Sequence, residues 1–443
     1  MTLTPALALL LQTPTSQTPP PWIGFFGFIS VPLIYTIVKI LVVFTVYMVS
    51  AALLTLAERK ISAFIQDRLG PNRVIKGWGQ PLADGVKNFM KEETLPDAVN
   101  KPLFLLAPAL AFIPALALWA VIPFAAPLPL KWGLMDMVVA DLPVGYLYIL
   151  ALASLGVYGI VLAGWSSNNK YALLGGLRSS AQMVSYEIAM GMSTIPVLLL
   201  AGDVSLGTIV RQQEQGLWNV LTLSIACLLF MVASFAETNR HPFDLPEAES
   251  ELVAGYLTEY SGLRWAMFFL GEYGNMTIVS AVATTLFLGG WSGPGTAIGF
   301  WTGALGSFWG QVVFNIICVF WFLFKMGALL TLFVWVRATL PRLRADQLMR
   351  FAWLFLIPLT LVNILLTGAL LLLPLGDTGR IAVAGIANWI LLFLFILAFR
   401  RLTGVNPLGR LPSWLRGRTP ATLVNRPATA AAKAKGVLAE THS

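Results

Sequence analysis

Apolar segments long enough to cross a lipid bilayer recur along the whole length of this chain. A helix needs about 20 apolar residues to cross the hydrocarbon core of a membrane. The 443 residues are 57% hydrophobic and 11% charged, whereas soluble proteins carry roughly 25% charged residues. We therefore predict an all-α polytopic membrane protein with about nine transmembrane helices. They are expected at residues 23–57, 102–124, 142–164, 179–201, 217–236, 264–289, 307–337, 350–374 and 381–400.

Composition divides the chain into three regions. Residues 1–22 are rich in Pro and Thr and are expected to form a loose N-terminus. They contain no Lys or Arg, which argues against a cleaved secretory signal. Residues 23–401 hold all the predicted spans and form the transmembrane domain. Residues 402–443 are basic, lack a core-forming pattern and are expected to form a mobile cytoplasmic tail.

The basic residues predict how the chain is oriented. Most of the 29 Lys and Arg residues fall in the tail or in segments on one side of the predicted helices. The segments on the other side hold Lys131, Arg211 and Arg380. Because basic loops remain cytoplasmic, we expect the N-terminus outside and the C-terminus inside a bacterial plasma (inner) membrane. Orientation thus explains the formal net charge of +8, and no nucleic-acid partner is expected.

Residues that hold redox centres are scarce. The cysteines are Cys227 and Cys318, both in apolar segments, and the histidines are His241 and His442. Iron–sulfur clusters need groups of Cys ligands, and haem needs a suitable axial ligand. We therefore expect no cofactor or metal to be bound by this chain, and any electron carriers to lie on partner proteins.

Several ionisable residues fall inside predicted spans or at their ends. Such a group costs about 2.5–3.5 kcal/mol at the centre of a bilayer, so each needs an explanation. A buried Glu can be neutral and hydrogen-bonded, can form an ion pair, or can belong to a proton path. The number of these residues favours a proton path. They are Lys39, Glu58, Glu187, Glu237, Glu272 and Lys325.

The first inner loop, residues 58–101, is too long and too patterned for a simple connection. Apolar residues recur at helical spacing after Pro81, and charged residues take the other faces. We predict an amphipathic helix that begins at Pro81 and ends before Pro96. It is expected to lie at the membrane interface or to pack under a peripheral partner; a solvated surface helix is the simpler alternative.

The second inner loop, residues 237–263, is unusually acidic for the cytoplasmic side. Pro242 and Pro246 prevent a continuous helix there, and a helix is expected to begin at Pro246. The helix dipole explains acids in its first turn, but not the whole set, and a cluster of this kind can store protons. The acids are Glu237, Asp244, Glu247, Glu249, Glu251 and Glu259.

These loops resemble one protein family. The first contains AERK at 57–60, RLGPNR at 68–73 and QPLADGVKNFMKE at 80–92. The second contains AETNRHPFDLPEAESELVAGYLTEYSG at 236–262, and two further motifs are SYEIAMG at 185–191 and PRLRADQLMR at 341–350. The chain resembles the H subunit of respiratory complex I, the proton-pumping NADH:quinone oxidoreductase, from about residue 23 to the ninth span. One departure is VIKG at 74–77, where the family has a Gly-Pro turn.

The resemblance implies a subunit that is not catalytic alone. It implies a quinone-access chamber formed with peripheral subunits, adjacent small membrane subunits as further partners, and contact with membrane lipid. Quinone, such as ubiquinone, is then the substrate of the complex, and its reduction drives proton translocation. The resemblance also implies that flavin and iron–sulfur clusters, which carry the electrons from NADH, lie on partner subunits.

The resemblance further implies two groups of site residues. Residues implied to line the quinone chamber, with the inner ends of the first and seventh spans, are Glu58, Arg59, Arg68, Arg73 and Asp84. Residues implied to form the proton path are Glu187, Glu237, Glu247, Glu249, Glu251 and Glu272.

Three alternative functions remain open from the sequence. The first is the related membrane-anchor subunit of hydrogenase-type complexes, which uses no quinone. The second is an independent secondary transporter, although no internal repeat is evident. The third is a purely structural anchor, which explains the spans but not the acids inside them.

Overall fold

The computed structural model describes residues 31–73, 75–130, 133–244, 253–296, 307–374 and 376–403. The predicted loose N-terminus, nearly all of the basic tail, and Glu247, Glu249 and Glu251 lie outside these residues. Two units are distinguished, Met1–Trp389 and Ile390–Ser443, and the features below belong to the first. The helices are α2 (Val31–Ile65), α3 (Gln80–Met90), α4 (Lys101–Ala117), α5 (Gly145–Ser166), α6 (Lys170–Ala201), α7 (Leu206–Gln215), α8 (Asn219–Thr222), α9 (Ser224–Glu237), α11 (Gly262–Phe287), α13 (Ser307–Thr339), α14 (Ala345–Phe351), α15 (Ile357–Leu371) and α16 (Asp377–Thr403).

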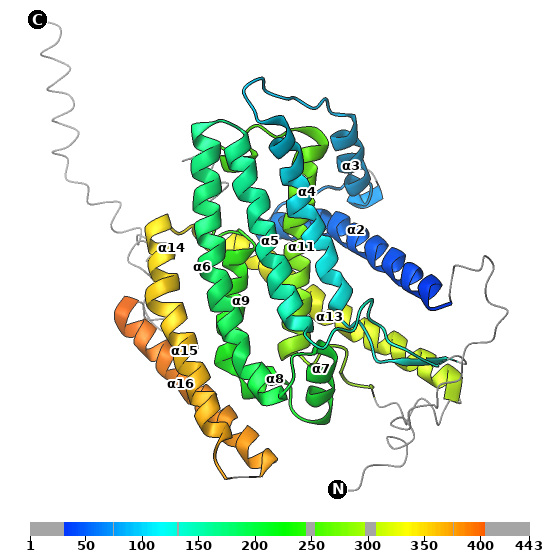
Figure 1. Cartoon of the computed structure of the whole chain (residues 1–443), viewed down its shortest axis with the longest axis vertical. Coiled ribbons are helices and arrows are strands. Elements are labelled where there is room, and N and C mark those ends of the chain that lie inside the picture. The colour runs from blue at the N-terminus through cyan, green and yellow to red at the C-terminus, as the bar shows by residue number, and fades with distance from the viewer. Residues whose placement is uncertain are drawn as a thin grey trace, which may run out of the picture. The chain divides into compact units, whose positions relative to one another are not determined.

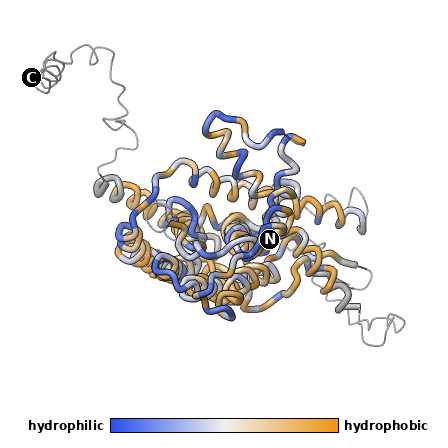
Figure 2. Tube along the Cα trace, turned by 90° about the horizontal axis from the view of Figure 1, so that it is seen from above, coloured by the Kyte–Doolittle hydropathy of each residue, from blue (hydrophilic) through white to orange (hydrophobic). Residues whose placement is uncertain are grey.

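The described fold is all-α and polytopic, as predicted. Within the described residues, seven helices are long and apolar enough to cross a membrane. The two remaining predicted spans correspond to α9, a shorter apolar helix, and α11, which has 26 residues. Figure 2 shows hydrophobic residues along most helices and hydrophilic residues gathered in the connecting segments. A two-stranded pairing of β1 (Leu128–Leu130) and β2 (Gly133–Met135) in the loop before α5 was not anticipated.

Helices α4, α5, α6 and α9 run side by side, and α11 packs against α4 and α13 (Figure 1). Glycine allows the closest approaches. A Cβ added at Gly159 in α5 would lie 2.7 Å from the backbone nitrogen of Ala111 in α4. One added at Gly164 in α5 would lie 2.7 Å from the carbonyl oxygen of Ala172 in α6. Small residues that bring helix backbones together are typical of packing inside membranes.

Two helices extend further than the sequence predicted. Helix α2 continues to Ile65 instead of ending at residue 57, so the first two residues of the predicted inner loop, Glu58 and Arg59, are helical. Helix α6 begins at Lys170 instead of residue 179 because Asn169 caps it: Asn169 Oδ1 accepts a hydrogen bond from the backbone N–H of Tyr171. The sequence did not predict either extension, because both carry charged residues and these residues were expected to lie outside the membrane-spanning helices.

The amphipathic helix predicted in the first inner loop is α3. Pro81 occupies its first turn, where the missing N–H costs nothing. The chain reaches α3 through the VIKG segment, in which Ile75, Lys76 and Gly77 all have positive φ values of 46°, 53° and 90°. A Cβ added at Gly77 would lie 2.2 Å from the carbonyl oxygen of Pro71. Glycine is therefore required at this turn.

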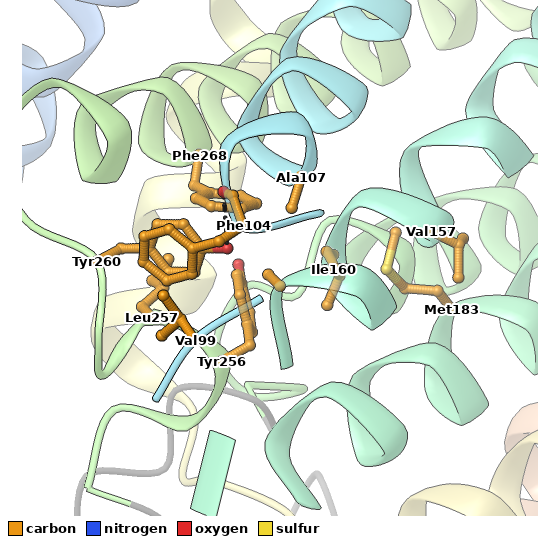
Figure 3. Close-up of a cluster of buried hydrophobic side chains, with 11 residues drawn as sticks. Val99, Phe104, Ala107, Val157, Ile160, Met183, Tyr256, Leu257, Tyr260 and Phe268 are labelled. Atoms are coloured by element: carbon orange, nitrogen blue, oxygen red, sulfur yellow. Dashed lines mark hydrogen bonds between the residues drawn. The ribbon is translucent and has the colours of Figure 1, made fainter. Parts of the chain in front are cut away.

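An aromatic cluster holds the second inner loop against the helices (Figure 3). The rings of Phe104 in α4 and Tyr260 are stacked with centroids 4.0 Å apart, and Phe268 in α11 meets Tyr260 edge-on. Burial raises the pKa of Tyr260 to about 12, so its hydroxyl remains a donor, and it bonds the carbonyl oxygen of Phe104 at 3.2 Å. The loop that precedes α11 is thereby fixed next to α4.

Candidate functional site

A large cavity lies among the C-terminal half of α2, helix α3, the start of α11 and the end of α13. Its volume is about 1010 Å³. Four of the five residues predicted for the chamber line it, and Arg73 does not; Arg73 is exposed elsewhere in the first inner loop. The four residues are Glu58, Arg59, Arg68 and Asp84.

The lining of the cavity changes in character along α2. Met48, Ala51 and Ala52 contribute apolar surface, and Glu58 and Arg59 contribute charge. Ten residues of helix span about 15 Å, so the apolar and charged ends are separated by roughly the length of a small organic molecule. Mostly apolar pockets with a few placed polar groups are typical of small-molecule sites. This arrangement suits a ligand with a polar head and an apolar tail.

Helix α3 turns mainly polar and small residues towards the cavity. The α3 residues that line the cavity are mostly polar or small, with Phe89 as the large apolar one, whereas Leu82 and Met90 are 75% and 82% exposed. The lining residues are Pro81, Asp84, Gly85, Lys87, Asn88 and Phe89. Arg59 on α2 forms an ion pair with Asp84 on α3, with Nη2 and Oδ2 3.0 Å apart. This pair joins two walls of the cavity, but both side chains are partly exposed, so it adds at most about 1 kcal/mol of stability.

The charged end of the cavity leads into a buried ionic cluster centred on Arg240. The Arg240 side chain is 4% exposed. Its Nη1 lies 3.2 Å from Oε1 of Glu58, and its Nε lies 2.8 Å from Oε1 of Glu272. Arg240 therefore joins a carboxylate that lines the large cavity to a second carboxylate on α11.

Two more side chains complete this cluster around Glu58. Arg337, near the end of α13, forms an ion pair with the Glu58 carboxylate. The hydroxyl of Tyr273 donates a hydrogen bond to the same carboxylate, and the Arg240 guanidinium lies 4.4 Å from the centre of the Tyr273 ring. Glu58 thus has partners on α11, on α13 and in the segment after α9. Such a set satisfies a buried carboxylate that would otherwise be costly.

The segment 237–244 owes its position to Gln182 of α6. The Gln182 side chain is fully buried and its amide nitrogen donates to the carbonyl oxygens of Ala236 and Phe243, at 2.7 and 2.6 Å. One side chain thus ties together the start and the end of the turn that carries Arg240. The prolines prevent a helix here, and the freed backbone groups obtain partners from α6.

Glu237, at the end of α9, lines two separate small cavities. The first has a volume of about 30 Å³ and is lined by Glu237, Glu272 and Asn275, among others. The second has a volume of about 20 Å³ and is lined by Glu237, Asn275 and Tyr146, among others. Glu237 therefore lies between Glu272 and Tyr146.

Glu187 lies further along, on α6. It accepts a hydrogen bond from the hydroxyl of Ser154 on α5. Its carboxyl group lies within electrostatic range of Glu237 and of Tyr146. Of the six residues predicted for a proton path, the structure thus brings Glu187, Glu237 and Glu272 near one another, and Glu247, Glu249 and Glu251 lie outside the described residues.

Some residues of this site were not singled out from the sequence. The most important of them is Arg240. The sequence does distinguish it, because it is the one Arg or Lys within the acid-rich segment 237–251. Tyr273 directly follows Glu272, and only the fold brings it to Glu58. No signal marked Tyr146 or Asn275, because isolated polar residues of this kind also occur in ordinary helix packing.

Comparison with known proteins identifies the family. The NADH dehydrogenase family matches residues 38–368. Of the NADH-quinone oxidoreductase H subunits, the one numbered 2 in Geobacter metallireducens is 49% identical over 360 residues, which cover 77% of this chain and 98% of the relative. The one numbered 1 in Geobacter sulfurreducens is 50% identical over 357 residues, covering 77% and 97%. The H subunit of Magnetococcus marinus is 46% identical over 347 residues, covering 78% and 94%.

The chain belongs to the family of NADH-quinone oxidoreductase H subunits. The resemblance read from the two inner loops is thereby confirmed. The family match includes the residues that line the large cavity and all members of the ionic cluster. The basic tail of this H-subunit family member lies beyond the match.

Proposed function

We propose that this chain is the membrane subunit of an NADH-quinone oxidoreductase complex in which the large cavity admits quinone and the buried carboxylates pass on the charge change of quinone reduction. The chain acts with the other subunits of the complex and is not catalytic alone. The observation that carries the proposal is the position of Glu58. It lines the cavity and shares Arg240 with Glu272, so one cation connects the ligand space with the interior.

The cavity fits a quinone by its chemistry. A quinone ring carries two carbonyl oxygens, which accept hydrogen bonds, and its isoprenoid tail is apolar. Arg59, Tyr273 and Arg337 bring donors to the charged end, and Ala51, Ala52 and Phe269 bring apolar surface for the tail. Electrons arrive from flavin and iron–sulfur clusters on partner subunits, and Arg73, exposed in the first inner loop, is available to contact such partners.

Reduction of quinone to quinol consumes two electrons and two protons. Negative charge that develops on the quinone attracts Arg240 and Arg337 away from Glu58 and Glu272. This weakens the ion pairs of these carboxylates and so favours their protonation; about 1.4 kcal/mol of lost interaction shifts a protonation equilibrium tenfold. Glu272, Glu237 and Glu187 then carry the change towards neighbouring membrane subunits, and Glu247, Glu249 and Glu251 supply protons from the cytoplasmic side.

The membrane orientation follows from the charge distribution. The basic loops and the tail face the cytoplasm, and the N-terminus faces the outside of the bacterial inner membrane. The charged end of the cavity, with Glu58 and Arg59, is then on the cytoplasmic side. Peripheral subunits that bring electrons can cover it there, and quinone can enter from the lipid along the apolar surface near Met48.

A substitution that narrows the cavity tests this function. Ala52 lines the cavity, and Leu53, the next residue along α2, is 42% exposed and does not. We expect Ala52→Phe to raise the KM for ubiquinone about tenfold, since roughly 1.4 kcal/mol of binding is lost when the added ring occupies ligand space. The measurement is NADH:ubiquinone reductase kinetics in native membranes, normalised to assembled complex.

Leu53→Phe is the matched control, because it adds the same ring to the same helix on its outer face. Its KM should stay near that of the unmodified chain. Equal KM values for Ala52→Phe and the unmodified chain would contradict quinone access through this cavity.

A further inference from the structure

The described residues include polar atoms that are buried without a hydrogen-bond partner, and two of them face the same small cavity. Tyr146 is 1% exposed; Thr194 lies close to its hydroxyl, but the hydroxyl forms no hydrogen bond with it or with any other described residue. Oε2 of Glu237 is likewise buried and unpartnered within the described part of the chain. Both residues line the cavity of about 20 Å³. A buried polar atom without a partner costs about 1–3 kcal/mol, so two such atoms around one space need an occupant.

The size and lining of this cavity fit one water molecule. A water needs at least roughly 10–15 Å³ of such volume and two to four polar partners. Tyr146, Glu237 and Asn275 supply three, and the rest of the lining is apolar, for example Ile149 and Phe230. The neighbouring cavity of about 30 Å³ shares Glu237 and Asn275 and adds Glu272. A water in this second cavity has Glu272 as one polar partner and Glu237 and Asn275 as others.

We propose that Tyr146 is a proton-relay residue that, with Asn275, holds a water against Glu237 and so connects Glu237 to Glu187. The inference rests on the proposed function, because it extends the path of carboxylates by one tyrosine and two water sites. Glu237 is the junction: it faces Glu272 across one cavity and Tyr146 across the other.

The geometry of α5 and α6 points the relay towards Glu187. Tyr146 and Ala153 on α5 both line the cavity, and the next residue, Ser154, bonds Glu187. On α6, Met190 lines the cavity and follows Glu187 by three positions, which places the two on neighbouring parts of one helix face. The hydroxyl of Tyr146 is therefore within the electrostatic reach of Glu187.

The transfer conserves protons at each group. Glu237 releases its proton to the water, and the water passes one of its own protons to the Tyr146 oxygen. Tyr146 gives up its original hydroxyl proton, and the Glu187 carboxylate is the group that finally accepts it, so one proton leaves Glu237 and one arrives at Glu187. A rotation of the hydroxyl and of the water resets the relay, and no electron carrier or other reactant is needed.

Tyr146→Phe removes only the hydroxyl and is the direct test. In native membranes, we expect NADH-driven proton translocation per assembled complex to fall about tenfold, equivalent to roughly 1.4 kcal/mol on the transfer barrier. We also expect turnover to become more sensitive to replacement of H₂O by D₂O, since proton transfer then limits the rate. A packing defect alone would not change that isotope sensitivity.

Tyr148→Phe is the matched control on the same helix. The Tyr148 hydroxyl donates to the carbonyl oxygen of Ala117 at 3.3 Å and does not line either small cavity, so this variant should keep native translocation. If Glu237→Gln is defective but Tyr146→Phe behaves like Tyr148→Phe, the relay is overturned and the proposed function stands. Native translocation in Glu237→Gln would overturn both. A high-resolution map of the complex should show water density between Tyr146 and Glu237, and an empty cavity there would also overturn the relay.

Discussion

Replacing Arg240 by Met is expected to abolish most quinone reductase activity and to destabilise the protein. The guanidinium is buried between Glu58 and Glu272, and removing one partner of a buried ion pair costs about 3–5 kcal/mol because a charge is left uncompensated. Glu58 keeps Arg337, so the larger loss falls on Glu272. We expect less assembled complex on native gels and at least about tenfold lower NADH:quinone activity per assembled complex, equivalent to roughly 1.4 kcal/mol.

A double variant separates folding from function at this position. Arg240→Met with Glu272→Gln removes the uncompensated charge together with its partner, and such replacement of a whole pair is often neutral for stability. Assembly should therefore recover, whereas activity should not. In assembly and in activity, Arg240→Lys should lie between Arg240→Met and the unmodified chain. Its ammonium group keeps the charge but cannot present the planar fork of donors that reaches both carboxylates.

Arg211→Met is the control for loss of an arginine as such, because Arg211 is exposed in α7, away from the cluster. It should assemble and turn over normally. If Arg240→Met retained native activity, the cluster would have no part in coupling.

Replacing Glu237 by Gln is expected to stop proton translocation without loss of the fold. Glu237 lines both small cavities, and an amide of the same shape fills the same space but cannot take up and release a proton as a carboxyl group does. The measurement is NADH-driven acidification of inverted membrane vesicles, followed with a pH-sensitive dye. We expect a fall of at least about tenfold relative to the unmodified complex, or roughly 1.4 kcal/mol on the transfer step.

Glu214→Gln serves as the control for this second variant. Glu214 is an acid on α7 that lines none of the three cavities described above. Acidification by Glu214→Gln vesicles should match the unmodified chain. Equal acidification by the Glu237→Gln and Glu214→Gln vesicles would remove Glu237 from the path.

Features encoded locally were predictable from the sequence. The apolar segments predicted the helices, and Pro81 with the apolar spacing after it predicted α3. The sequence prediction ended α2 too early, because a helix can continue beyond the hydrocarbon core of the membrane. Glu58 and Arg59 continue the helix since their charges find partners on other elements, among them Arg240 and Asp84.

The ionic cluster depends on contacts that no local pattern reveals. Glu58 and Arg240 are separated by 182 positions in the chain, and Arg240 reaches Glu272 only because Gln182 fixes the turn between residues 236 and 243. Through the family resemblance, the motifs at 57–60 and 236–262 pointed to Glu58, Arg59 and Glu237, which the structure places in the site, but not to Arg240. They did not indicate which charges pair, because pairing is a property of the packed helices.

The most direct test of quinone binding in the large cavity is to map where quinone binds in the assembled complex. A ubiquinone analogue with a photoreactive group on its ring would be crosslinked in native membranes, and the labelled peptides of this chain would be mapped. We predict labelling within 48–66 of α2 and 263–273 of α11, the segments that line the cavity. Excess ubiquinone and Ala52→Phe should each lower that labelling. Labelling confined to other segments, or no labelling of this chain while the analogue blocks activity, would contradict the account.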